Sequence, residues 1–170
     1  GLSSKDLDEA LAAAWKKEGI TPAPLADDAT YLRRLSIDLL GIIPTEEEVT
    51  SFLADTAAYK RSKAVSRLLG TPRATEALVD YWESILLPPA PRERRVSRPD
   101  FRVFLRERFA NNVGWDKTTS DLVTATGQNG GQPEGATPVN GAVSYLLKFG
   151  NQVPDLAGTV SKTFLGVQIQ

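Results

Sequence analysis

The sequence predicts an all-α fold, a single-domain orthogonal bundle of about eight or nine short helices across residues 1–170. Three observations support this prediction. Apolar residues recur at intervals of three and four, which is the spacing of one helix face. Glycine, proline and capping residues divide the chain into segments of helix length. No stretch alternates between apolar and polar residues over the length of a strand. A chain of this size can bury one sizeable core, so one domain is expected.

The first predicted helix begins at Ser3 or Ser4 and ends at Gly19. A serine can accept hydrogen bonds from the free N–H groups of a first turn, and glycine suits the left-handed position after a last turn. One face of this helix is expected to pack into the core, and its residues are Leu7, Ala10, Leu11, Ala14 and Trp15. The proline-containing stretch 21–24 is expected to be an extended connector.

A helical hairpin is expected over residues 27–53. Asp27 or Asp28 can cap its first helix, and Gly41 with Pro44 ends that helix. Thr45 and Glu48 have the spacing of a capping box for the second helix. The acidic residues at both helix starts are interpreted as caps rather than as paired carboxylates for catalysis or metal binding. The expected apolar faces consist of Leu32, Leu35, Ile37 and Leu39, and of Val49, Phe52 and Leu53.

Two more helices are expected before a proline-rich break. The first of them ends at Gly70 and should turn Ala64, Val65, Leu68 and Leu69 inward. Thr71 and Pro72 are a typical helix start for the next one. That helix carries a wide apolar stripe made of Ala74, Ala77, Leu78, Tyr81, Trp82 and Ile85. The run of prolines that follows predicts a possible sub-domain boundary near 88–97.

The C-terminal half predicts one highly charged helix followed by shorter ones. Ser97 and Pro99 open the charged helix, whose apolar side carries Phe101, Phe104, Leu105 and Phe109. Residues 111–116 are expected to form a turn, and a short helix then ends at Gly127. A long polar loop near 128–141 follows and is expected to be mobile. The last two helices are expected near 143–149 and 155–164.

The composition excludes several classes of site. The chain has no Cys, His or Met, which excludes thiol nucleophiles, disulfides, Ser-His-Asp triads and the usual zinc, copper and haem ligands within it. No catalytic residue and no metal site are predicted. A net charge of −1 gives no reason to expect nucleic-acid binding. No apolar run approaches the roughly 20 residues that span a membrane. Because the sequence starts with Gly rather than Met, a processed or shortened protein is expected.

The most charged stretch, residues 92–108, is the first candidate site. Guanidinium groups bind carboxylates and phosphates bidentately, so its arginines are candidates for contact with an anion or a partner. The residues assigned to this contact are Arg92, Arg94, Arg95, Arg98 and Arg102. The alternative is a solvated helix face whose arginine stems cover the aromatic residues and pair in part with Glu93 and Glu107. The sequence favours this alternative, because the neighbouring apolar residues are spaced as core.

Two smaller sets of residues are candidates for binding but are interpreted as structural. Arg33, Arg34 and Asp38 lie on adjacent helical turns, and a partly buried ion pair between Arg34 and Asp38 is expected. Trp15 and Trp82 fall on apolar stripes, so core packing is expected for both. Trp115 lies in a predicted turn; packing is expected for it too, but it is the candidate for stacking against a ligand such as a sugar.

Two stretches, DDATYLRRLSIDLLGIIPTEEEV and the C-terminal SKTFLGVQIQ, resemble a known family. It is the domain of unknown function found in large secreted bacterial proteins, notably of planctomycetes, beside planctomycete-type cytochrome c domains. Its members typically read D-D-A-T-F-L-R-R-x-x-L-D-L-x-G-x-x-P-T, and Tyr31 here stands in place of the Phe. The matching motif residues are Asp28, Arg33, Arg34, Asp38, Gly41, Pro44 and Thr45. Weaker blocks follow in the same order, so the resemblance covers most of residues 25–170.

The resemblance implies a setting rather than a reaction. In the family an F-L-G-x-x-I-x segment is typically followed by Cys-x-x-Cys-His, the attachment signature of c-type haem. The same segment in this chain runs to Gln170. The resemblance therefore implies a c-type haem after this residue and no cofactor within the chain. It also implies a periplasmic or cell-surface protein that is linked to redox domains and carbohydrate-binding modules.

Three functions remain open from the sequence. The first is a non-catalytic scaffold for the adjacent haem segment, in electron transfer or in degradation of extracellular polymers. Its partners would be downstream domains of the same polypeptide, a redox protein or a polysaccharide. The second is a glycan- or anion-binding module that uses Trp115, the loop 127–141 and nearby arginines. The third is a carboxylate-only hydrolase, which would need two acids about 5–9.5 Å apart in one cleft.

Overall fold

A computed structural model describes residues 3–87, 96–130, 139–150 and 152–168. The fold of this part of the chain is all-α, as predicted, with nine α-helices, one π-helical turn and no strand; Gln128 and Val139 form an isolated bridge. The elements are α1 (Ser4–Lys17), α2 (Asp28–Leu40), α3 (Glu46–Ala54), α4 (Lys60–Leu69), α5 (Pro72–Leu86), α6 (Arg98–Ala110), α7 (Trp115–Val123), α8 (Val143–Leu147), α9 (Val153–Val160) and η1 (Ser161–Leu165).

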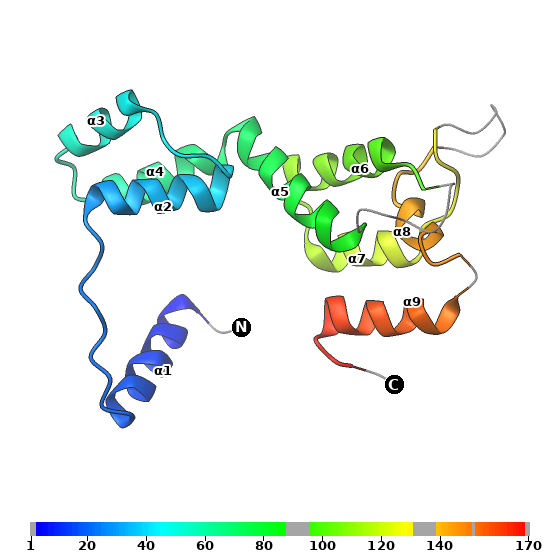
Figure 1. The fold of residues 1–170 in the computed structure, drawn as a ribbon, viewed down its shortest axis with the longest axis horizontal. Coiled ribbons are helices and arrows are strands. Elements are labelled where there is room, and N and C mark those ends of the chain that lie inside the picture. The colour runs from blue at the N-terminus through cyan, green and yellow to red at the C-terminus, as the bar shows by residue number, and fades with distance from the viewer. Residues whose placement is uncertain (1–2, 88–95, 131–138, 151, 169–170) are drawn as a thin grey trace.

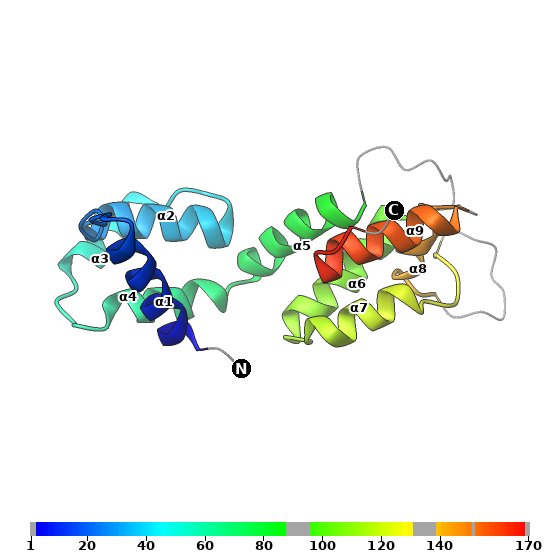
Figure 2. The same ribbon diagram turned by 90° about the horizontal axis from the view of Figure 1, so that it is seen from below.

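The helices gather into two groups that meet at α5 (Figures 1 and 2). We call α2, α3 and α4 the N-terminal group, and α5 to η1 the C-terminal group. The C-terminal group holds the largest buried cluster, in which Phe101, Leu105 and Tyr145 are 0% exposed. The N-terminal group has two smaller clusters, one around Leu32 and one around Leu68. The expectation of a single domain is not tested by this arrangement and stays a prediction, and the predicted boundary near 88–97 lies largely outside the described residues.

The predicted helix starts are confirmed by their hydrogen bonds. The Asp27 carboxylate accepts from the Thr30 N–H at 2.8 Å, which caps α2. Thr45 and Glu48 form the reciprocal capping box of α3. Gly41 ends α2 at φ +68°, the left-handed conformation in which a residue without Cβ is least strained. Local chemistry therefore fixes the turn between α2 and α3.

The expected core face of α1 is wrong. All residues of α1 are exposed, and Leu7 (54%), Leu11 (50%) and Trp15 (38%) are its largest apolar side chains on the surface. None of its residues joins a buried cluster, and the helix lies apart from the others in Figure 1. The local signals are nevertheless correct, because Ser3 caps α1 and Gly19 follows it at φ +67°. Helical spacing identifies an apolar face but not what covers it.

The apolar stripe expected on α5 is wrong in part. The residues of that stripe that are exposed are Leu78 (40%), Tyr81 (60%) and Ile85 (41%). The fully buried residues of α5 are instead Val79 and Leu86. The buried side of α5 differs from the expected stripe because α6 packs along the side of α5 that carries the α5 acidic residues. Ala74 and Trp82 do pack against the buried clusters, as expected.

Other inward positions are mostly confirmed in the N-terminal group. Leu32, Phe52, Ala64 and Leu68 are buried. The positions wrongly expected to face inward are Ile37 (39% exposed), Leu53 (50%) and Leu69 (52%). Each of these short helices packs on the rest of the group through one face only. Apolar residues next to that face are therefore left exposed to solvent.

The C-terminal group follows the predicted order, with shifted boundaries. α6 begins after Ser97 and buries Phe101, Phe104 and Leu105. α7 begins at Trp115 itself rather than after a turn. The described ends of the polar loop are held in place: the Asn140 N–H donates to the Gln128 carbonyl at 2.8 Å, and the Gly130 N–H donates to Asp100 at 2.9 Å. Residues 131–138 of that loop lie outside the described part.

Two further points concern packing and length. Gly141 lies against the backbone of α6, where an added Cβ would come within 2.0 Å of the Asp100 carbonyl oxygen, so only glycine fits. No helix in the described ranges is both long enough and apolar enough to cross a bilayer.

Candidate functional site

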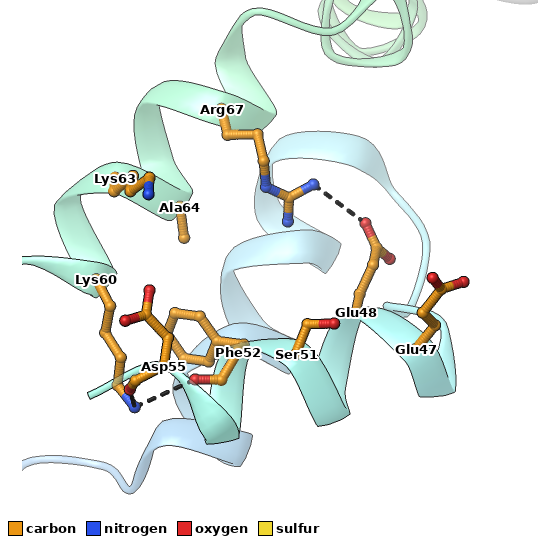
Figure 3. Close-up of a pocket in the computed structure, with 9 residues that line it drawn as sticks. All are labelled: Glu47, Glu48, Ser51, Phe52, Asp55, Lys60, Lys63, Ala64 and Arg67. Carbon is orange, nitrogen blue, oxygen red and sulfur yellow. Dashed lines mark hydrogen bonds and ion pairs between the residues drawn. The ribbon is translucent and has the colours of Figure 1, made fainter. Parts of the chain in front are cut away.

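A pocket lies between α3 and α4 and is open to solvent (Figure 3). It has a volume of about 310 Å³. Its floor is apolar and includes Phe52 and Ala64, which belong to the cluster beneath α2. Its walls carry acidic residues on α3 and basic residues on α4. The full lining consists of Glu47, Glu48, Ser51, Phe52, Asp55, Lys60, Lys63, Ala64 and Arg67.

Charged contacts hold the two walls of this pocket together. At one end Arg67 reaches from α4 to Glu48 on α3, at 3.3 Å (Figure 3). At the other end the Lys60 ammonium donates to the carbonyls of Phe52 (3.2 Å) and Asp55 (2.8 Å), the last acceptors of α3. The backbone N–H of Thr45, followed by the Arg67 guanidinium, holds the pKa of Glu48 below its ordinary value. Both ends are thus occupied by contacts within the protein.

The middle of the pocket carries polar groups that could meet a ligand. Among the described residues, Lys63 and Glu47 have no ion pair, and both are exposed. The arrangement can bind a small polar molecule through these charged groups. Within the described ranges no three acidic residues come together in a way that could hold a metal ion.

Asp28, the first motif residue, is an anchor between α2 and α4. Its carboxylate meets the Lys60 ammonium and the Arg61 guanidinium, each at 2.8 Å. These two donors, Lys60 first, hold the pKa of Asp28 below its ordinary value. Arg61 also donates to the Ala26 carbonyl at 2.7 Å and lies 4.6 Å from the Tyr31 ring centre. The opening residues of the family-like motif therefore have a structural role.

The expected ion pair between Arg34 and Asp38 is wrong. Both side chains are exposed, as is Arg33, and no contact joins the pair in the described structure. The inward side of α2 is taken by Leu32, Ser36 and Leu40, so residues two positions away point to solvent. The remaining motif residues, Gly41, Pro44 and Thr45, form the turn and the cap that were expected of them.

The arginines of α6 face α5 and form what we call the arginine–carboxylate ladder. It consists of Glu76, Asp80 and Glu83 on α5 and Arg98, Arg102 and Arg106 on α6. Arg102 is central: its guanidinium lies 2.6 Å from Glu83, 2.8 Å from Asp80 and 3.2 Å from Glu76. Glu83 and Asp80 hold the pKa of Arg102 above its ordinary value, and Arg106 lowers the pKa of Glu76.

The ladder changes the interpretation of the arginine-rich stretch. Arg98 and Arg102 are neutralised by α5, Arg98 through Glu83 at 2.7 Å. The acidic partners found for Arg98, Arg102 and Arg106 lie on α5 rather than at Glu107. Glu93 lies outside the described residues, as do Arg92, Arg94 and Arg95, so pairing of those arginines stays a prediction. Contact of this stretch with an external anion stays a prediction. The acidic residues of α5 lie four and three positions apart and the arginines of α6 lie four apart, but this spacing does not indicate that the two helices pack together.

Trp115 belongs to an aromatic cluster on the C-terminal group. Its ring centre lies 4.1 Å from that of Trp82 and 6.0 Å from that of Phe109. Tyr81 meets the edge of Trp82 at 5.5 Å. Packing of Trp82 and Trp115 is confirmed, but Trp115 also keeps 38% of its surface exposed. It is therefore available for stacking against a ligand as well.

Sequence reasoning missed two polar groups in the C-terminal core. Tyr145 is fully buried, its hydroxyl has no hydrogen-bond partner in the described structure, and burial raises its pKa to about 12. Lys148 donates to the Leu86 carbonyl at 2.6 Å and lies 4.3 Å and 4.6 Å from the ring centres of Tyr145 and Phe149. Burial lowers the pKa of Lys148 to about 8. No sequence signal marks either residue.

Residues 6–170 match the sequence model of one protein family, described as PSCyt2, protein of unknown function (DUF1549). The match covers the described fold except for the first two residues of α1. No curated protein and no solved structure matches the chain.

Proposed function

The chain belongs to the PSCyt2 family of proteins of unknown function, and from this premise we propose that it is a non-catalytic helical domain that supports a c-type haem segment. The family name is consistent with an association with cytochrome c domains. In this proposal the haem is carried by polypeptide that follows Gln170. The proposed setting is the periplasm or the cell surface, in electron transfer or in degradation of extracellular polymers.

The residues of this chain do not themselves fit a c-type haem. Covalent attachment needs two cysteines, and the axial ligands of such haems are His or Met. The sequence contains none of these three residue types. Support of the haem segment therefore means packing against it, not ligation of its iron.

The exposed apolar surface at the C-terminal end of the fold is the observation that supports this proposal most. One side of α9 and η1 packs on the C-terminal core through Leu156, Val160 and Phe164. The side chains left in solvent are Val153 (69%), Leu165 (71%) and Val167 (53%). Apolar side chains left exposed beside a packed face are typical of an interaction surface. A following segment would supply the second layer.

A longer protein tests this proposal. The parent polypeptide, extended through the segment after Gln170, is produced in a host that matures c-type cytochromes, and haem is followed by its Soret absorbance. We expect Leu165→Asp to reduce the thermal stability of the haem spectrum, because the charge disrupts packing beneath the haem segment. Leu25→Asp is the matched control, since Leu25 is 92% exposed in the α1–α2 connector. Equal effects of the two variants would contradict the proposal.

A glycan-binding module is the second candidate, and the exposed face of Trp115 favours it. Tyr81, 60% exposed, lies in the same aromatic cluster. Exposed aromatic rings with polar rims are typical of interaction surfaces. A thermal-shift screen against oligosaccharides tests this candidate, because a bound sugar raises the melting temperature. Trp115→Ala should abolish such a shift, whereas Tyr59→Ala, an exposed aromatic residue (69%) outside the cluster, should keep it.

A further inference from the structure

α1 is an amphipathic helix whose apolar side is uncovered. Leu7, Leu11 and Trp15 follow one another at intervals of four residues and are 54%, 50% and 38% exposed. Helices of 14 residues are marginal in water when alone, because most of their stability in proteins comes from packing of the apolar face. Its capping box makes α1 a well-defined helix. A covering surface is therefore expected for it.

The C-terminal group presents an uncovered apolar surface of its own. We call it the α5 ridge, formed by Leu78, Tyr81 and Ile85, which are 40%, 60% and 41% exposed. These positions repeat at three and four residues, so they share one side of α5. Trp115 extends the surface through its contact with Trp82. Exposed apolar patches of this kind mark interaction sites.

We propose that the α5 ridge is the docking site of α1 from the same chain. The two surfaces match in length: Leu7 to Trp15 spans about 12 Å of helix, and Leu78 to Ile85 spans about 10 Å. Rows of side chains at four-residue spacing on one helix fit grooves between rows on another. Docking covers both apolar faces at once. This inference concerns the N-terminal end of the chain and is independent of the haem proposal.

The connector between α1 and α2 is long enough for this docking. It comprises residues 18–27, which can span about 33 Å when extended. α2 is about 20 Å long, and its C-terminal end touches α5, where Arg73 donates to the Leu40 carbonyl at 2.9 Å. Leu78 lies about 8 Å further along α5. The segments along α2 and α5 thus add up to about 28 Å, before the lateral step from Leu40 to α5 is added, against a connector reach of about 33 Å.

The tether also sets the direction of docking. α1 must approach from the α2 end of α5, with its own C-terminal end leading back to the connector. The two helices therefore run antiparallel, which places Trp15 beside Leu78 and Leu7 beside Ile85. Leu11 then lies opposite Tyr81. These pairings determine where cysteines are introduced in the experiment below.

A double-cysteine variant tests the docking directly, because the chain has no native cysteine. Leu11→Cys with Tyr81→Cys replaces two exposed side chains and should form an intramolecular disulfide on mild oxidation, giving a cross-linked monomer. The effective concentration of a tethered helix favours this bond over one between chains. Glu9→Cys with Tyr81→Cys is the matched control. Glu9 lies on the opposite side of α1, so this pair should stay reduced. A disulfide-linked dimer, equal cross-linking of both pairs, or no cross-link would overturn the proposal.

Hydrogen exchange provides a second readout without cysteines. Tyr81→Asp should increase exchange of the α1 amides, because docking is lost, while the α6 amides keep their protection and show that the core is folded. Unchanged exchange in α1 would contradict docking on the ridge.

Discussion

The N-terminal and C-terminal groups are both small helical assemblies, but they are stabilised differently. The N-terminal group divides its buried residues between two small clusters and relies on caps and on the Asp28 anchor. The C-terminal group has one large cluster with many fully buried side chains, and the arginine–carboxylate ladder lies along its main helix pair. Helix caps thus contribute a larger share to the first group, beside one long-range anchor at Asp28, and long-range contacts contribute most to the second.

The largest expected difference between the groups comes from their cores. Phe101→Ala in the C-terminal group should lower the free energy of unfolding by about 3–5 kcal/mol, because a fully buried ring is replaced by a cavity. Phe52→Ala in the N-terminal group should lower the free energy of unfolding by less. Phe52 lines the open α3–α4 pocket, so water can enter the space it leaves. Chemical denaturation followed by circular dichroism measures both. An equal or larger cost for Phe52→Ala would refute the comparison.

Loss of a charged contact should also lower the free energy of unfolding more in the C-terminal group than in the N-terminal group. Arg102→Ala leaves Glu83, with a side chain only 12% exposed, without its closest partner. We expect the free energy of unfolding to fall by about 1–2 kcal/mol. The effect is smaller than for a fully buried ion pair because Arg102 is partly exposed. Arg67→Ala removes the more exposed pair with Glu48 and should cost at most about 0.5 kcal/mol. Denaturation at low and high salt checks this, and a ladder no stronger than the Arg67 pair would count against it.

The cap of α3 tests how much local chemistry contributes to the N-terminal group. Thr45→Ala removes the acceptor of the Glu48 N–H and breaks the capping box, which should cost about 1 kcal/mol. Thr45→Ser keeps the hydroxyl and should cost little. Thermal unfolding of the two variants gives the comparison, and indistinguishable midpoints would mean that the cap contributes nothing.

The smallest expected effect concerns pH and Lys148. Its pKa is about 8 in the folded protein and near its ordinary value when unfolded. The unfolded state then binds more protons between these values, so stability rises with pH from about 8 toward 10. The rise should be under about 1 kcal/mol, because the Leu86 carbonyl and two rings favour the charged amine. Lys148→Met should abolish it. The window stops near pH 10, since the raised pKa of Tyr145 reverses the trend above that value.

Features that depend on neighbouring residues in the chain could be predicted from the sequence. The caps at Asp27, Thr45 and Thr71 and the stop at Gly41 each involve residues within four positions. The fold class follows from the same local signals. The prediction of the apolar face of α6 was also correct, because the charged residues of this helix leave only one side apolar.

Features that depend on which helix lies alongside could not be predicted. The side of α5 that stays exposed depends on where α6 packs. The apolar face of α1 stays exposed because α1 packs against none of the buried clusters. The partners of Arg102 lie 19 to 26 residues away, and the anchor at Asp28 joins residues more than 30 apart. The α3–α4 pocket arises because both helices pack on α2 rather than on each other. Periodicity along one chain contains none of this pairing.

The absorbance spectrum of the parent protein, extended beyond Gln170 and matured in a competent host, tests the central claim most directly. The haem-support account predicts a Soret band that remains with the polypeptide under denaturing conditions, as covalent attachment requires. A folded, extended protein without that band would contradict it.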